Sequence, residues 1–206
     1  MKYVFGVLGV IFVVILVVVL ITRGGDRAPE EPPVVVSEEA REGVSAVYTE
    51  KGVITGEDRR RSIRIIVNQD ERRLEILTGY GDAIERAQTY PNTHSAFEAF
   101  LIALDSEGFD REQLEPIGID ERGACPLGRT YIYELIEFSQ PLIDLWGTSC
   151  GTKIGTFAGD KAAIRKLFQL QIPDYKDQVE DVDLSGTEVP EDDEESSQQS
   201  VPYMAR

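Results

Sequence analysis

The amino-acid sequence predicts an α+β fold, in which an N-terminal transmembrane helix precedes one small domain built on an antiparallel sheet. Three features of the 206-residue chain support this prediction. Residues 3–22 carry no charged side chain, residues 63–76 alternate apolar and polar side chains as a β-hairpin does, and two later segments repeat apolar residues at helical spacing. We expect about five strands and two packed helices, in the order β-β-β-α-β-β-α.

Residues 3–22 are long enough to cross a bilayer as a helix. A span of ~20 residues covers the ~30 Å hydrocarbon core, and Lys2 and Arg23 stand at its ends, where they can reach the headgroups. A cleaved signal peptide has a shorter apolar stretch, about 7–15 residues, and a small-residue cleavage site, which this segment lacks. The sequence therefore predicts that residues 1–23 are an uncleaved anchor in contact with membrane lipid.

The net charge of −16 is concentrated outside the expected domain. Residues 24–45 are rich in Pro and acidic side chains, which predicts an extended linker, and residues 176–206 predict a disordered acidic tail. Residues 46–175 remain as a single domain that is large enough to bury a core. Because acidic flanks repel phosphate groups, we expect no nucleic-acid partner.

The first hairpin has a register that the sequence itself specifies. One register places all apolar side chains on one face and opposite charges on the other: Val67 faces Arg72, Ile65 faces Leu74, Ile63 faces Ile76, and Arg64 faces Glu75. A slip of one residue would move every apolar side chain to the polar face. A third strand is expected over residues 83–90.

The remaining elements are two helices and a second hairpin. Ser95 and Glu98 have the spacing of a capping box, which predicts that a helix begins at Ser95, and Gly108 is a natural residue to end it. The second hairpin is expected over residues 130–149 with its turn at 139–140, and its strands are apolar on both faces. A last helix is expected over residues 160–171, before Pro173.

Two cysteines flank the second hairpin. Cys125 precedes its first strand and Cys150 follows its second strand, so strand pairing brings them together and predicts a disulfide. A bridge closing a loop of this size stabilises a domain by about 3 kcal/mol in the chain-entropy model. Disulfides persist in oxidising compartments, so we expect a single-pass protein of the cell membrane with an extracytoplasmic domain. A cytoplasm-facing domain with two free thiols is the alternative, because the positive charges around the anchor are balanced.

The sequence contains no convergent catalytic or metal-binding set. One histidine and two cysteines do not make a standard zinc site, and no phosphate-binding glycine-rich loop is present. We therefore expect no catalytic residue, cofactor or metal. The enzymatic alternative is a cysteine transpeptidase, because the order His94, Cys150, Arg165 on an anchored β-rich domain is similar to that of sortases.

The basic side chains form one cluster on and beside the first hairpin. It consists of Arg59, Arg60, Arg61, Arg64, Arg72 and Arg73. This cluster is a possible basic patch for an acidic partner, such as the chain's own tail or an anionic wall polymer. The alternative is a solvated face whose arginines pair with neighbouring carboxylates.

Four segments carry a resemblance to known proteins. They are residues 125–134 (Cys-Pro-Leu-Gly-Arg-Thr-Tyr-Ile-Tyr-Glu), 146–150 (Trp-Gly-Thr-Ser-Cys), 155–160 (Gly-Thr-Phe-Ala-Gly-Asp) and 167–175 (Leu-Phe-Gln-Leu-Gln-Ile-Pro-Asp-Tyr). The sequence here resembles uncharacterised membrane-anchored envelope proteins of Saccharibacteria-type bacteria. The resemblance implies an exported setting and supplies no activity. We expect a non-enzymatic binding or envelope-assembly module with an unknown protein or envelope partner.

Overall fold

The computed structural model describes residues 34–117 and 120–186. The expected anchor at residues 1–23, the first part of the linker and the tail beyond residue 186 lie outside the described residues. Within the described ranges, no helix is both long enough and apolar enough to cross a membrane.

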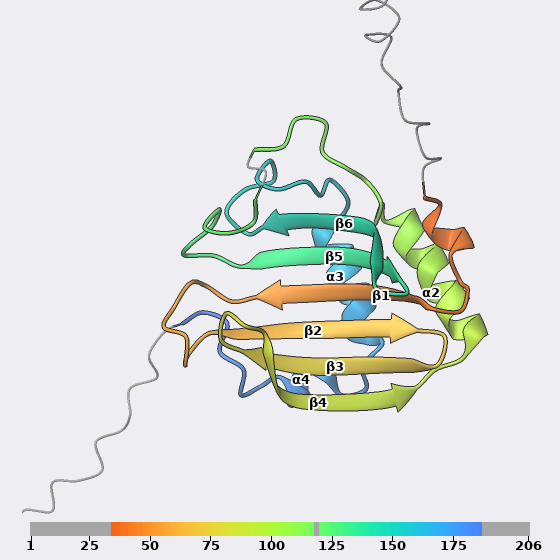
Figure 1. Ribbon diagram of the computed structural model, residues 1–206, viewed down its shortest axis with the longest axis horizontal. Helices are drawn as coiled ribbons and strands as arrows, with labels where there is room; N and C mark the ends of the chain where they lie inside the picture. Colours follow the sequence, from red (N-terminus) through yellow and green to blue (C-terminus); the bar gives the residue numbers. More distant parts are fainter. Residues whose placement is uncertain (1–33, 118–119, 187–206) are drawn as a thin grey trace, which may run out of the picture. The chain divides into compact units, whose positions relative to one another are not determined.

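One antiparallel sheet organises the domain, with the strand order β4-β3-β2-β1-β5-β6 (Figure 1). The strands are β1 (Val44–Lys51), β2 (Arg61–Asn68), β3 (Glu71–Thr78), β4 (Ala83–Pro91), β5 (Thr130–Glu137) and β6 (Gln140–Thr148). The expected α+β fold with an antiparallel sheet is confirmed. The expected number of strands is wrong by one, because the sheet has six.

The strand that the sequence did not predict is β1, which joins the two hairpins by pairing with β2 on one side and β5 on the other. Its core-facing side chains include Ala46, Tyr48 and Glu50, all buried. A small residue and a carboxylate on the buried face weaken the alternation of apolar and polar residues that identifies a strand.

The first hairpin has the predicted register. Ile65 pairs with Leu74, and Arg64 pairs with Glu75 on the opposite face. At the turn, the side-chain oxygen of Asn68 accepts hydrogen bonds from the backbone N–H groups of Asp70 and Glu71, at 2.9 and 2.8 Å. This is the local bonding by which Asn favours turns.

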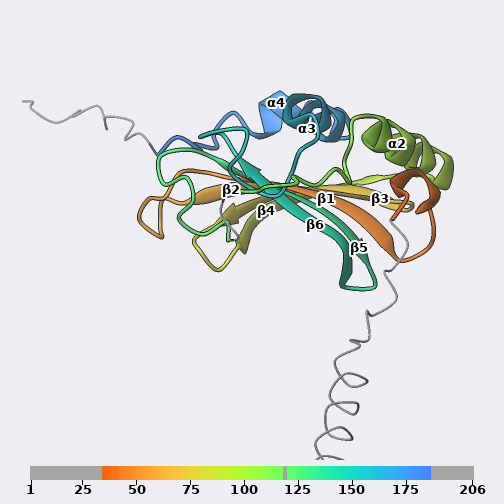
Figure 2. The same ribbon diagram turned by 90° about the horizontal axis from the view of Figure 1, so that it is seen from above.

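The helices are η1 (Val36–Glu38), α2 (His94–Ser106), α3 (Lys161–Leu170) and the short α4 (Tyr175–Gln178). Figure 2 shows α2, α3 and α4 on the same face of the sheet. The capping box expected at Ser95 is wrong by two residues: Thr93 is the N-cap, and its side chain accepts from the N–H of Ala96. Gly108 has φ +74° beyond the end of α2, as its predicted role requires.

The core between the sheet and the helices is rich in aromatic rings. Tyr133 stacks on Phe157 with ring centroids 4.0 Å apart, and Phe168 of α3 packs edge-on against Phe100 of α2 at 5.1 Å. Val36 and Leu184 also belong to this core. The buried core therefore includes apolar side chains on both sides of the expected residues 46–175.

Candidate functional site

The face of the sheet opposite the helices, here called the open face, carries aligned rows of side chains. Thr49 of β1 lies opposite Arg64 of β2 and Ile132 of β5, and Ile132 in turn lies opposite Trp146 of β6. In the next row, Glu134 of β5 lies opposite Asp144 of β6. Because successive side chains of a strand point to opposite faces, these residues face away from the aromatic core.

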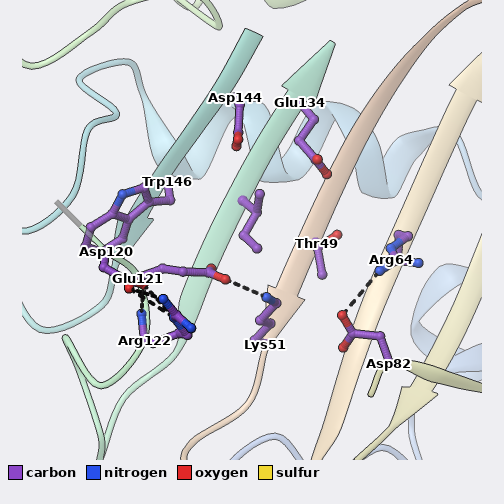
Figure 3. Close-up of a pocket in the computed structure, with 11 residues that line it drawn as sticks. Thr49, Lys51, Arg64, Asp82, Asp120, Glu121, Arg122, Glu134, Asp144 and Trp146 are labelled. Carbon is purple, nitrogen blue, oxygen red and sulfur yellow. Dashed lines mark hydrogen bonds and ion pairs between the residues drawn. The ribbon is translucent and has the colours of Figure 1, made fainter. Parts of the chain in front are cut away.

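A groove of about 580 Å³ lies over these rows. It is lined by Thr49, Lys51, Arg64, Asp82, Asp120, Glu121, Arg122, Ile132, Glu134, Asp144 and Trp146. Figure 3 shows that β1, β2, β5 and β6 supply the floor, and that the β3–β4 turn and the segment before β5 supply the walls. The site therefore stands mainly on hydrogen-bonded strands, which hold side chains more firmly than loops do.

Three ion pairs neutralise most of the charge in the groove (Figure 3). Lys51 pairs with Glu121 at 2.9 Å, Arg64 with Asp82 at 3.6 Å, and Arg122 with Asp120 at 2.6 Å. The side-chain hydrogen bond from Arg122, helped by its backbone N–H, lowers the pKa of Asp120 to about 2. Each cationic side chain of the groove thus already has a carboxylate partner.

The other two acids, Glu134 and Asp144, form a carboxylate pair that has no ion-pair partner among the residues the structure describes. Like charges directly opposite each other on neighbouring strands destabilise a sheet. Burial raises the pKa of Glu134, and the charge of Asp144 raises it further, while Arg64 and Lys51 act in the opposite direction. The groove thus retains two negative charges that its own cations do not neutralise.

Thr49 adds a hydroxyl group to the floor of the groove. The residue as a whole is only 2 % exposed, and it lines the groove floor. Its hydroxyl is not among the buried polar atoms that lack a partner within residues 34–117 and 120–186, so water in the groove can reach it.

A second hollow of about 390 Å³ adjoins the groove and shares Lys51, Asp82, Glu121 and Arg122 with it. It continues past Ile54 and Tyr80 to Cys125. The guanidinium of Arg60 stacks on the ring of Tyr80, 4.3 Å from its centroid. The groove therefore extends towards the end of the sheet that carries the cysteines.

Cys125 and Cys150 lie at disulfide distance, with their Cα atoms 5.9 Å apart, as the sequence predicts. This link ties the segment before β5 to the residues after β6. Gly128 packs directly against both sulfur atoms, and a β-carbon there would collide with Cys125. The link lies within a few residues of Asp120–Arg122, so it helps to fix one wall of the groove.

The arginines of the expected basic patch are distributed over both faces of the first hairpin. Arg61 pairs with Glu85 at 2.8 Å, and Arg73 pairs with Glu75 at 2.9 Å. Arg64 contacts Glu75 as well as Asp82, while Arg72 donates to the carbonyl oxygen of Pro91 at 3.0 Å. Arg59 lies in the turn before β2.

The residues of the transpeptidase alternative are not brought together. His94 begins α2 at the end of the sheet where β6 starts, whereas Cys150 follows the other end of β6 (Figure 1). Nine strand residues separate these ends, roughly 30 Å. Arg165 lies on the helix side, where its Nε is 3.8 Å from Glu50 and its guanidinium stacks on Tyr131. Within the described part of the chain, no cluster of three His, Cys, Asp or Glu residues could hold a metal ion.

Of the residues that line the groove, sequence reasoning singled out only Arg64, as part of the possible basic patch, and it missed Thr49, Glu134, Asp144 and Trp146 above all. A signal was present, because Glu134 and Asp144 interrupt otherwise apolar strands on the face away from the core. No protein-family model and no curated protein matches the chain.

Proposed function

We propose that this chain is a non-enzymatic binding module, tethered to the membrane by residues 3–22, whose ligand site is the groove on the open face. The observation that carries the proposal is the groove itself. It combines a volume of about 580 Å³ with two carboxylates that have no ion-pair partner among the described residues and with a hydroxyl on its floor. A concave site with a few convergent polar groups is the usual form of a ligand site.

The cysteine pair and the apolar segment 3–22 support an extracytoplasmic location for the domain, because disulfides persist in oxidising compartments. The resemblance to anchored envelope proteins points in the same direction. The ligand is then a protein or another envelope component that meets the domain outside the cytoplasm.

Site-directed photocrosslinking in the native membrane tests this proposal. A photoreactive amino acid replaces Arg122, whose side chain is 86 % exposed at the rim of the groove. The matched control replaces Ile102, which is 52 % exposed on α2, on the other face of the sheet. We expect a discrete crosslinked species from position 122 alone. Equal crosslinking from both positions, or none from position 122, would contradict the proposal.

A further inference from the structure

We infer that the acidic tail, residues 187–206, docks on the second hollow of its own domain and pairs there with Arg60. This contact lies within the chain and does not depend on the ligand of the groove. Three observations carry it: the place where the described chain ends, a cation of the hollow that has no carboxylate partner, and the acidic composition of the tail.

The described chain ends beside the second hollow. The carbonyl oxygen of Leu184 accepts a hydrogen bond from the N–H of Val53 at 3.1 Å, and Gly186 lies so close to Thr55 that a β-carbon there would collide with its methyl group. The carbonyl oxygen of Thr55 accepts a hydrogen bond from the hydroxyl of Tyr80 at 2.8 Å. Because Tyr80 lines the hollow, the tail begins next to it.

Arg60 is the cation of the hollow that lacks a carboxylate. The other two bases that line it, Lys51 and Arg122, form ion pairs with Glu121 and Asp120. The guanidinium of Arg60 stacks on a tyrosine ring, and its Nε is buried without a hydrogen-bond partner in the described part of the chain. Buried polar groups nearly always have a partner, and arginine binds carboxylates through charge-assisted hydrogen bonds. Arg60 is therefore placed to receive a carboxylate from the hollow.

The distribution of charge determines which end of the open face an acidic segment can approach. Figure 3 shows Lys51 and Arg122, which the groove shares with the hollow, at the end away from Glu134 and Asp144. The carboxylate pair repels further acids, whereas the hollow beyond Lys51 and Arg122 holds Arg60. An acidic segment is thus directed to the hollow and away from the carboxylate pair.

The tail supplies the carboxylates. Residues 187–206 contain six acids and one base, and five of the acids are consecutive, at positions 191–195. Glu191 is five residues beyond Gly186, and five extended residues span up to ~17 Å, enough to cross a hollow of about 390 Å³. Attachment to the domain also keeps the local concentration of the acidic run high. The run can therefore reach Arg60 from the point where the described chain ends.

A docked tail would cover one end of the groove. The hollow shares Lys51, Asp82, Glu121 and Arg122 with the groove, so the tail and a groove ligand would compete for the same surface. This consequence rests on the proposed function, whereas the contact between the tail and Arg60 does not.

Photocrosslinking within the full-length protein in detergent tests the contact. A photoreactive amino acid replaces Ile54, which is exposed and lines the hollow, and the matched control replaces Ile102, which is exposed on α2. Only crosslinks to residues 191–206 are counted, because residues 187–190 are near position 54 through the connectivity of the chain. A mixture of ¹⁵N-labelled and unlabelled protein distinguishes crosslinks within one chain from crosslinks between copies. We expect crosslinks within one chain, from position 54 only.

Charge variants separate electrostatic attraction from simple proximity. Arg60→Gln should lower the crosslink yield about two- to fivefold, the range for one partly exposed ion pair, and Arg60→Lys should retain most of the yield because it keeps the charge. Replacement of the five acids at 191–195 by their amides should lower the yield at least as much as Arg60→Gln does. Arg111→Gln, which changes an exposed arginine that does not line the hollow, should crosslink as the native chain does. Thermal unfolding shows whether each variant is folded.

Equal yields from the native chain and from either Arg60→Gln or the amide variant of the tail would overturn the inference, because proximity alone would then explain the crosslink. Equal yields from positions 54 and 102, no crosslink from position 54, or crosslinks only between different copies would overturn it as well. None of these results alters the crosslink to a separate partner that the proposed function predicts from position 122, so the two failures are distinguishable.

Discussion

Glu50 Oε1 accepts a hydrogen bond from Arg129 Nη1 at 2.8 Å, which places a buried carboxylate of β1 next to the residue that precedes β5. The other oxygen of Glu50 accepts from the hydroxyl of Tyr48 at 3.2 Å and lies 3.8 Å from Arg165 of α3. Burial, and then the charge of Glu50, raises the pKa of Tyr48, so this phenol stays protonated and donates. The buried carboxylate of Glu50 thus connects β1 with α3 and with the segment that precedes β5.

Replacement of Glu50 by Gln should destabilise the domain. Removing one partner of a fully buried ion pair typically costs about 3–5 kcal/mol, and the loss here should be smaller, because the side chains of Arg129 and Arg165 that lose their partner are 41 % and 32 % exposed. Arg129→Gln should also destabilise the domain, although Glu50 keeps Arg165 and the hydroxyl of Tyr48 as partners. Urea unfolding of the two variants measures both losses. Equal midpoints for Glu50→Gln and the native chain would show that this cluster does not stabilise the fold.

Replacement of Glu134 by Gln should stabilise the domain at neutral pH. The folded-state pKa of Glu134 is raised by burial and by Asp144, so the ionised form opposes folding. This penalty is absent below the unfolded pKa and grows as pH rises through the folded pKa. Relief of a directly opposed like-charge pair should be worth about 0.2–1 kcal/mol. Thermal unfolding at pH 7 should show the gain, and unfolding near pH 4 should show a smaller one.

Glu98→Gln is the matched control for the unfolding of Glu134→Gln. Glu98→Gln removes a carboxylate of the same type from the exposed surface of α2, and its unfolding temperature should follow that of the native chain at both pH values. A loss of stability in Glu134→Gln at pH 7 would mean that the carboxylate makes a favourable contact in the folded state.

Replacement of Cys125 or Cys150 by Ala should destabilise the domain by similar amounts, about 2–5 kcal/mol, because each substitution removes the same bridge. For the same reason, the double variant should lose no more than either single variant. Denaturant midpoints of the three proteins test this non-additivity. His94→Ala should have almost no effect, because His94 is exposed and lies at the opposite end of the sheet.

The transpeptidase alternative predicts a different pattern. A nucleophilic Cys150 would have a depressed pKa and react selectively with a thiol probe at neutral pH. Selective labelling of Cys150 that disappears in His94→Ala would therefore contradict a purely structural role for the cysteines.

The proposed extracytoplasmic location predicts which lysines an external reagent can reach. Lys153 and Lys166 are exposed on the domain, so a membrane-impermeant amine reagent should label both on intact cells. Mass spectrometry of the recovered protein identifies the labelled sites. Labelling of these lysines only after lysis would support the cytoplasm-facing alternative.

The parts of the fold that were predictable from the sequence are those in which neighbouring residues carry the whole signal. The register of β2 and β3 follows from alternation on two adjacent arms, and the cysteine pair follows from the two ends of one hairpin. The groove is different, because its floor needs β1 between the two hairpins. Without β1, nothing in the sequence places Thr49 near Glu134 or Arg64 near either of them.

Successive side chains of β5 face opposite sides of the sheet, and this limits which mutations the strand tolerates. Tyr133 belongs to the aromatic core and Glu134 to the groove, although they are adjacent in the chain. A single-residue insertion in β5 would exchange these environments and disrupt the core and the groove together. The segment of Asp120–Arg122 is not part of a strand, and surface loops tolerate changes in length better than strands do. Changes in the shape of the groove should therefore arise from substitutions on the strands and from changes of length in this wall.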